Sequence, residues 1–214
     1  MKARKTLLCI ILFCFALSCF SQCIEGDCKN GIGTFKFIDG EYTGAWKNSQ
    51  RHGYGKIQFN NNAYYDGSWR NDFPNGFGKC LYLSGEYYEG MFFEGQRHGE
   101  GKYSLTDGSY YSGNWEKGVR NGKGNYKYAD NSNYQGNWKN NLRDGFGEMQ
   151  YSNGEKYIGE WENDLFNGKG TIKYQNGDSY SGEFSDGKKQ GQGTYTYNSG
   201  KRFTGLWENG NLIK

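Results

Sequence analysis

Proline is almost absent from the sequence, which contains a single one, Pro74. Collagen and proline-rich linkers are thereby excluded. A net positive charge is also lacking once the first 21 residues are set aside. These hold three of the 26 Lys and Arg residues and no carboxylate, which leaves 26 − 3 = 23 cations against 23 anions. A balanced chain has no basic stripe to neutralise phosphates, so nucleic acid is not an expected partner.

Long hydrophobic runs are confined to the start of the chain. A basic opening (Lys2, Arg4 and Lys5) precedes an apolar run from Leu7 to Phe20, with small residues at Ser18 and Ser21. This pattern is typical of a secretory signal peptide over residues 1–21, cut after Ser21 or, alternatively, after Ser18. An uncleaved anchor helix and a lipoprotein acylated at Cys19 are the other interpretations. The predicted location is secreted, periplasmic or in the cell envelope.

Glycine and aromatic residues are abundant, with 35 Gly, 6 Trp, 19 Tyr and 14 Phe, and they are periodic. A Tyr-x-Gly-x-Trp motif begins every 23 residues, at Tyr42, Tyr65, Tyr88, Tyr111, Tyr134, Tyr157, Tyr180 and Phe203. The full motif stands at Tyr42/Gly44/Trp46, Tyr65/Gly67/Trp69, Tyr111/Gly113/Trp115, Tyr134/Gly136/Trp138 and Tyr157/Gly159/Trp161, and Phe92 and Phe184 replace Trp in two copies. Gly-x-Gly recurs with the same spacing from Gly53/Gly55 to Gly191/Gly193. Such a period indicates a repeat architecture.

The residues between the glycines alternate between apolar and polar, which predicts strands with Tyr, Gly and Trp on one buried face. Asn153-Gly154 and its counterparts indicate hairpin turns. The same class of turn is expected at Gly40, and a further turn class falls three residues after Trp, where Ser49, Asp72, Asn141 and Asp164 replace glycine. We predict one hairpin per repeat, with the stretch 139–144 connecting hairpins and folding over the aromatic face. The glycine between Tyr and Trp should make space for a ring of the neighbouring hairpin.

These motifs resemble the MORN repeat over residues 31–214, and residues 157–179 match nearly its whole consensus. The resemblance implies an all-β fold, an elongated twisted stack of antiparallel hairpins. It also implies scaffolding, self-association or membrane apposition. The expected organisation is a signal peptide (1–21), a cysteine-containing N-terminal cap (22–30) and a MORN-repeat array (31–214).

Catalytic and metal-binding patterns are missing. The only histidines, His52 and His98, stand before Gly-x-Gly, where other repeats carry Asn, Asp or Gln, so they are read as turn residues. No Cys-x-x-Cys or His-x-x-x-His spacing suggests a metal site. The carboxylates Glu160 and Glu162 could form a glycosidase pair, but nothing distinguishes them from other polar-face carboxylates. We expect no enzyme activity, cofactor or metal.

Two binding hypotheses remain. The first is a non-catalytic extracytoplasmic scaffold that binds an unknown protein partner or itself, with membrane-surface contact as an accompanying role. The alternative is a module that binds glycans or lipid headgroups through aromatic rings. The burial of the rings discriminates between them, because 27 of the 36 aromatics in the mature chain occupy predicted inward positions.

The cysteines outside the signal peptide are Cys23, Cys28 and Cys80. Cys80 replaces Ile57 and its counterparts at an inward position, so it is expected to be a buried thiol outside any disulfide. Cys23 and Cys28 flank Gly26, which can turn the chain, and a secreted protein meets an oxidising compartment. We therefore predict a Cys23–Cys28 disulfide.

Overall fold

The computed structural model of the chain describes residues 21–214. The predicted signal peptide lies outside the described residues except for Ser21, and so does Cys19. Every regular element between residues 21 and 214 is a β-strand, which confirms the all-β class. Within this range no helix is long and apolar enough to span a membrane.

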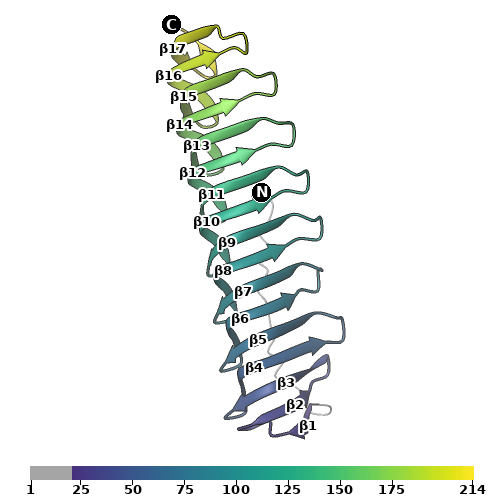
Figure 1. Cartoon of the computed structure of the whole chain (residues 1–214). Coiled ribbons are helices and arrows are strands. Elements are labelled where there is room, and N and C mark those ends of the chain that lie inside the picture. Colours follow the sequence, from purple (N-terminus) through teal and green to yellow (C-terminus); the bar gives the residue numbers. More distant parts are fainter. Residues whose placement is uncertain (1–20) are drawn as a thin grey trace. The chain divides into compact units, whose positions relative to one another are not determined.

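The residues divide into two compact units. The first unit contains the described residues up to Thr106 together with Trp115–Gly118, and its strands form an antiparallel meander in chain order (Figure 1). These strands are β1 (Gln22–Gly26), β2 (Ile32–Lys36), β3 (Gly40–Lys47), β4 (Gln50–Phe59), β5 (Tyr64–Arg70), β6 (Phe73–Leu81), β7 (Tyr87–Phe93) and β8 (Gln96–Ser104).

The second unit contains Asp107–Asn114 and Val119–Lys214 and is built on the same plan. Its strands are β10 (Val119–Lys127), β11 (Asn133–Lys139), β12 (Leu142–Gln150), β13 (Lys156–Glu162), β14 (Leu165–Lys173), β15 (Ser179–Ser185), β16 (Lys188–Thr196), β17 (Arg202–Glu208) and β18 (Asn211–Leu212). The residues of β9 (Tyr110–Glu116) are divided between the two units.

The stretch that follows each Trp position is a tight hairpin turn. Asn140 and Asn141 have φ of 52° and 72°, and the flanking residues pair as Lys139↔Leu142. Two successive left-handed residues define the type I′ turn, whose twist matches that of the strands. Ser49, an unusual residue for this conformation, adopts it as well, with φ of 61°.

The predicted division into hairpins and connections is corrected by this geometry. Residues 139–144 are not a connection: they form a turn and the paired start of β12, so the strands on either side of them continue the meander. The reason is that Asn140 and Asn141 both tolerate positive φ and close a hairpin themselves. Gly40 is corrected too: it lies in β3 and pairs with Phe59, whereas the other glycines of its class lie in turns.

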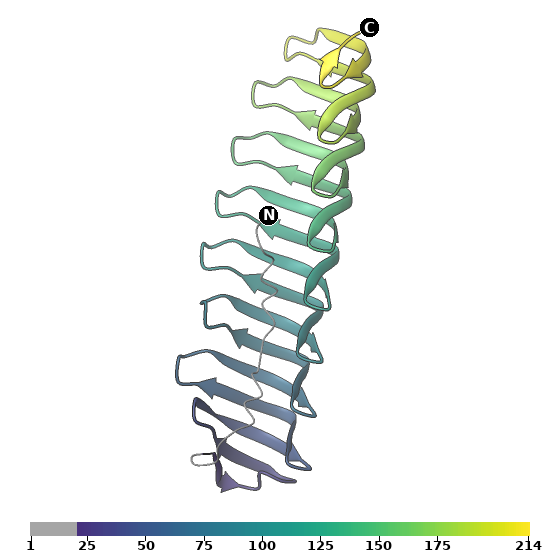
Figure 2. The same cartoon turned by 180° about the vertical axis from the view of Figure 1, so that it is seen from behind.

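Six of these hairpins contain a bulge: β3–β4, β5–β6, β7–β8, β11–β12, β13–β14 and β15–β16. The β11–β12 register shifts between Gly136 and Trp138, and Gly145, the first residue of Gly-x-Gly, has φ of +92°. A bulge bends its strand and increases the local twist. The start of the second strand consequently curls back (Figure 2), and Arg143 in this stretch lies over the rings of Tyr134 and Trp161. The prediction that this stretch covers the aromatic face is confirmed.

The Tyr and Trp positions of the repeat form the core of both units. Of the sixteen residues at these positions, fifteen are buried, and only Phe203 is exposed, at 36%. The predicted inward face is therefore confirmed for both ring positions of the motif.

The role of the glycine between Tyr and Trp is corrected, because it makes space for a different ring from the one predicted. A Cβ on Gly136 would lie 2.5 Å from Gly147 Cα on the paired strand, and it would collide with the hydroxyl of Tyr134 on its own strand. The same two groups, the tyrosine hydroxyl of the same strand and the Cα of the facing glycine, would collide with a Cβ at Gly44, Gly67, Gly113 and Gly159. Each tyrosine thus lies along its own strand over a pair of facing glycines, and no ring of a neighbouring hairpin occupies that space.

The N-terminal cap contains a strand of its own. β1 pairs antiparallel with β2, and the sulfur atoms of Cys23 and Cys28 lie 2.04 Å apart, in agreement with the predicted disulfide. Cys80 is buried, also as predicted. The cap therefore covers the edge of β2, which would otherwise present unpaired backbone groups to solvent.

We expect alkylation of the purified chain without reductant to label only Cys80, and only after unfolding because that thiol is buried. Cys23 and Cys28 should become reactive only after reduction. Intact-mass measurement of the alkylated chain measures this in three states: folded, unfolded without reductant, and unfolded after reduction. Labelling of all three cysteines in the unreduced, unfolded chain would contradict the disulfide.

Candidate functional site

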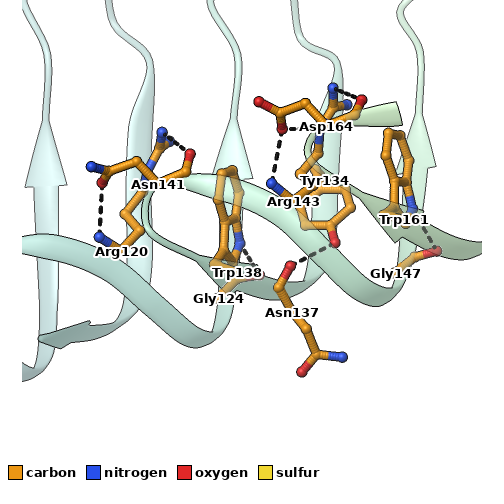
Figure 3. Close-up of polar contacts among 10 residues, drawn as sticks. All are labelled: Arg120, Gly124, Tyr134, Asn137, Trp138, Asn141, Arg143, Gly147, Trp161 and Asp164. Carbon is orange, nitrogen blue, oxygen red and sulfur yellow. Dashed lines mark hydrogen bonds and ion pairs between the residues drawn. The ribbon is translucent and has the colours of Figure 1, made fainter. Parts of the chain in front are cut away.

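The buried tyrosines have satisfied hydroxyl groups. Tyr134 Oη donates a hydrogen bond to the carbonyl of Asn137 at 2.9 Å, at the position where the bulge interrupts the strand pairing (Figure 3). The same bond, from Tyr to the residue three positions later, is made by Tyr42, Tyr65, Tyr88, Tyr111, Tyr157 and Tyr180. A buried hydroxyl without a partner would cost about 1–3 kcal/mol, so the bulge and the tyrosine stabilise each other.

Each of the six tryptophans at the repeat positions connects its repeat to the preceding one. Trp138 Nε1 donates to the carbonyl of Gly124 at 3.3 Å, and Trp161 Nε1 donates to that of Gly147 (Figure 3). Trp46, Trp69, Trp115 and Trp207 make the equivalent bond. Their rings also meet tyrosines edge to face, for instance Trp138 with Tyr111 at 5.4 Å between centroids. Neighbouring repeats are thus joined through the indole as well as through the strands.

A ladder of cations lies over the tryptophans, and the sequence prediction missed it. Arg143 pairs across the turn with Trp138, and its guanidinium carbon lies 4.1 Å from the ring centroid of Trp161. Its Nε and Nη2 atoms donate to Asp164 Oδ1 and O at 2.9 and 3.0 Å (Figure 3). The equivalent cation–π pairs are Arg51–Trp69, Arg97–Trp115, Arg120–Trp138 and Lys189–Trp207. Burial lowers the pKa of both Arg120 and Lys189.

The ladder leaves a signal in the sequence. Five of the six tryptophans have a Lys or Arg 18 residues earlier, whereas Phe92 and Phe184 have Pro74 and Phe166 there. Trp is the best cation–π acceptor, so a cation at this position accompanies an indole and an uncharged residue accompanies a phenyl ring. The exception is Trp46, which has Cys28 of the N-terminal disulfide at the equivalent position.

The opposite face of the first unit carries exposed apolar residues. Four large ones, separated by the small half-buried residues Ala45 and Ser68, make up one row across six consecutive strands. We call this row the outer stripe: Ile32, Ala45, Tyr54, Ser68, Phe77 and Met91. Register joins them in pairs, Ile32 with Ala45, Tyr54 with Ser68, and Phe77 with Met91. Successive pairs adjoin at the bulges, next to the glycine pairs Gly44↔Gly55 and Gly67↔Gly78. The exposed fractions are 73% for Ile32, 67% for Tyr54, 52% for Phe77 and 42% for Met91. Exposed apolar rows of this kind mark interaction sites on soluble proteins.

The second unit has a different composition in the same row. Its members are Asn114, Lys123, Asn137, Phe146, Glu160, Lys169, Glu183, Gln192 and Leu206. Only Phe146 and Leu206 are exposed large apolar residues there, at 59% and 38%. The repeats are therefore alike in the core and different on the outer face, which is where binding specificity can reside.

Comparison with models of protein families identifies the repeat. Seven consecutive copies of the MORN repeat match residues 42–64, 65–87, 88–110, 111–133, 134–156, 157–179 and 180–202. The chain belongs to the MORN-repeat family. The MORN matches share the predicted repeat starts from Tyr42 to Tyr180, and the segment from Phe203 corresponds to a partial copy.

No curated protein matches the MORN chain significantly. Among solved structures, it is similar to the TCP domain of SAS-4 from Drosophila melanogaster in complex with a proline-rich motif of Ana2, at 14% identity over 71% of this chain and 83% of that one, with a TM-score of 0.42. The wild-type TCP10 domain of Danio rerio CPAP is similar at 13% identity over 79% and 87% of the two chains, with a TM-score of 0.39. Likenesses at this level do not extend to function.

The two candidate carboxylates form hydrogen bonds within their own hairpin. Glu160 Oε1 accepts the backbone N–H of Lys169 at 3.1 Å, and Glu162 accepts a bond from the Asn167 amide. His52 and His98 lie within strands β4 and β8, so their interpretation as turn residues is corrected, and each buries Nδ1 without a hydrogen-bond partner. Between residues 21 and 214 no cluster of three or more His, Cys, Asp or Glu side chains could hold a metal ion.

A double-mutant cycle tests the cation ladder of the MORN array. We expect Arg143→Phe and Trp161→Phe each to lower the free energy of unfolding by about 1–2 kcal/mol, because each removes the cation–π contact and hydrogen bonds. The double variant has Phe at both positions, like the native pair Phe166 and Phe184. Its loss of unfolding free energy should therefore be about 1 kcal/mol smaller than the sum of the two single losses. Denaturant unfolding measures all four proteins. Additivity within about 0.5 kcal/mol would show that the two residues act independently.

Alkaline pH should unfold the MORN array through its core tyrosines. Burial raises the pKa of Tyr42 and of Tyr111 from the usual 10.0 to about 12, and it raises the pKa of Tyr134 as well. The folded state then binds more protons than the unfolded state above pH 10, so stability present below pH 10 is lost as the pH rises towards 12. Tyrosinate absorbance and circular dichroism should change together. Ionisation of all tyrosines near pH 10 in a chain that stays folded would contradict this.

Proposed function

We propose that the chain is a non-catalytic extracytoplasmic scaffold that binds protein, either a partner or a second copy of itself. The observation that carries the proposal is the contrast between the two faces of the sheet. The aromatic residues at the Tyr and Trp positions are buried in the core, except Phe203. In the outer stripe of the first unit, by contrast, Tyr54 and Phe77 are more than half exposed. Buried aromatic anchors surrounded by polar residues dominate protein interfaces, and these exposed rings have charged neighbours such as Lys56 and Lys79.

Affinity capture from the extracellular or envelope fraction tests the proposal. The bait is the secreted chain, compared with Tyr54→Ser/Phe77→Ser and with Phe146→Ser. Phe146 occupies the same place in Gly-x-Gly in the second unit, and it is similarly exposed, so it is a matched control. Protein should be enriched by the wild type and by the control and lost with the stripe variant. Retention of every captured protein by the stripe variant would overturn the assignment to this surface.

Glycan or lipid-headgroup binding is the second candidate. Exposed rings on a strand face favour it, and Tyr54 is oriented across the strands because its hydroxyl bonds to Asp66 on β5. Fewer rings are available than the composition suggests, since the Tyr and Trp positions are buried. Enrichment of glycan or lipid instead of protein in the same capture would favour this candidate and overturn the first.

The extracytoplasmic location is part of the proposal and rests on the signal-peptide pattern of residues 1–21 and on the Cys23–Cys28 disulfide. N-terminal sequencing of the protein recovered outside the cytoplasm should begin at Gln22. A chain recovered from the cytoplasm with its first residues intact would overturn the location without affecting the binding surface.

A further inference from the structure

We propose that the outer stripe is a self-complementary dimer interface, on which a second copy of this chain packs face to face. The two-fold axis lies in the interface, parallel to the strands and between β4 and β5. β4 of one copy then lies opposite β5 of the other, β3 opposite β6, and β2 opposite β7. The inference rests on the proposed scaffold function and deepens it, since it names the surface and the partner for self-association.

The order of side-chain sizes along the stripe supports this axis. The ring of Tyr54 on β4 is flanked by two small residues, Ala45 on β3 and Ser68 on β5. The two-fold places Tyr54 opposite Ser68 of the second copy, and Phe77 opposite Ala45. Each ring therefore meets a small residue and can fill the space above it, as side chains do in packed sheets. The ends of the stripe meet as well, because Ile32 falls opposite Met91.

The two ends of the outer stripe support the same position for the two-fold axis. It runs from β2 to β7, and the corresponding residue on β8 is Glu100, which is charged and exposed. A two-fold between β4 and β5 superposes the two stripes over their whole length and leaves Glu100 outside. An axis moved by one strand, to lie between β5 and β6, would set Glu100 opposite Ala45 of the second copy. Burying a carboxylate against an apolar side chain is unfavourable without a partner.

The charged row beside the stripe excludes intermediate registers. Its cross-strand pairs are Lys56↔Asp66 and Lys79↔Glu89, so the sign alternates from β4 to β7. With the axis between β4 and β5, Lys56 lies opposite Asp66 of the second copy at two symmetric places. An axis on β4 would put Lys56 opposite itself, and one on β5 would put Asp66 opposite itself. Like charges facing each other disfavour a register strongly.

The size of the surface sets the expected affinity. Six strands at about 4.8 Å span about 24 Å from the first to the last, and the outward positions of each strand add about 20 Å in the other direction. This footprint is at the small end of specific interfaces. The dimer should therefore be reversible, with a dissociation constant in the micromolar range, and no change in the core of either copy is required.

Sedimentation equilibrium of the purified secreted chain tests the dimer. We expect a monomer–dimer equilibrium for the wild type and for Phe146→Ser. Lys56→Asp and Asp66→Lys should each weaken dimerisation by about ten-fold or more, since each creates two like-charge contacts. Mixing these two variants should restore dimers, because every contact between positions 56 and 66 in the mixed pair joins opposite charges. A fold defect would not be repaired by mixing.

The outcomes separate this inference from the proposed function. A wild-type chain that stays monomeric at all concentrations, or a mixture that fails to recover, would overturn the dimer. If the chain is monomeric and Tyr54→Ser/Phe77→Ser still fails to capture the proteins that the wild type captures, the proposed function stands. The protein that binds the outer stripe is then a different protein and not a second copy of this chain. Dimers that survive both Lys56→Asp and Asp66→Lys would overturn this interface and place self-association elsewhere on the chain.

Discussion

Trp138→Ala is expected to lower the free energy of unfolding by about 3–5 kcal/mol, as truncation of a buried tryptophan does. The Trp138 ring is 4% exposed and packs against Tyr111 and Tyr134 at 5.4 and 5.1 Å between centroids. The substitution also removes the cover of the Arg120 guanidinium, 4.3 Å from the ring, and the bond to the carbonyl of Gly124. Chemical denaturation monitored by circular dichroism measures the loss.

Trp138→Phe is the matched control, because two native repeats already carry Phe92 and Phe184 at this position. A phenyl ring keeps most of the apolar contact but loses the hydrogen bond and the better cation–π acceptor, so a loss of about 1–2 kcal/mol is expected. A change below about 0.5 kcal/mol in Trp138→Ala, the size seen at surface sites, would mean that the ring is not part of the core.

Much of the fold could be predicted from the sequence because the repeat reports the same geometry eight times. The 23-residue period, the Tyr-x-Gly-x-Trp face and the buried Cys80 all follow from residue spacing. The turns after Trp are where the spacing predicts them, but their role differs from the predicted one. The alternation of apolar residues gives the face of a strand without indicating where pairing resumes after a turn, and that depends on the φ of Asn140 and Asn141.

The role of the motif glycine could not be predicted for a related reason. Spacing shows that Gly44, Gly67, Gly113 and Gly159 share a face with Tyr and Trp, and a missing side chain there implies that some ring needs the room. Which ring it is depends on the direction in which the tyrosine leaves its strand. That direction is set by the hydrogen bond from its hydroxyl to the bulged residue three positions later, as in Tyr157 with the carbonyl of Glu160.

The candidate site was harder to predict than the fold. The Tyr and Trp positions of the core carry an aromatic residue in every repeat, so they can be recognised in the sequence. Tyr54, Phe77 and Met91 differ from their counterparts in other repeats, so the repeat pattern does not indicate their role. Their importance depends on register, which brings residues about 14 positions apart side by side across neighbouring strands. The cation ladder also depends on register. In the sequence, a Lys or Arg precedes every tryptophan but one by 18 residues. The structure explains this spacing, because it places Arg143 over the ring of Trp161.

Gly147→Ala is expected to destabilise the chain by about 3 kcal/mol or more, at or above the upper end of the usual cost of overpacking. A Cβ on Gly147 would collide with Tyr134 Oη and would lie 2.6 Å from two carbon atoms of its ring. The ring has no room to retreat, because Tyr134 is fully buried and packs against Trp138 and Trp161 on its two sides. Accepting the methyl group would also require breaking the bond from Tyr134 Oη to the Asn137 carbonyl.

Gly154→Ala separates this steric effect from backbone strain. Gly154 has φ of +90° and nothing within 4 Å of an added Cβ, so its substitution tests the left-handed backbone alone, at about 1–2 kcal/mol. The φ of Gly147 is not in that region, so its whole loss must come from the collision with Tyr134. Denaturant unfolding of the two variants side by side gives the comparison. If Gly147→Ala costs no more than Gly154→Ala, the tyrosine ring is not locked against that glycine and the packing described for the core is wrong.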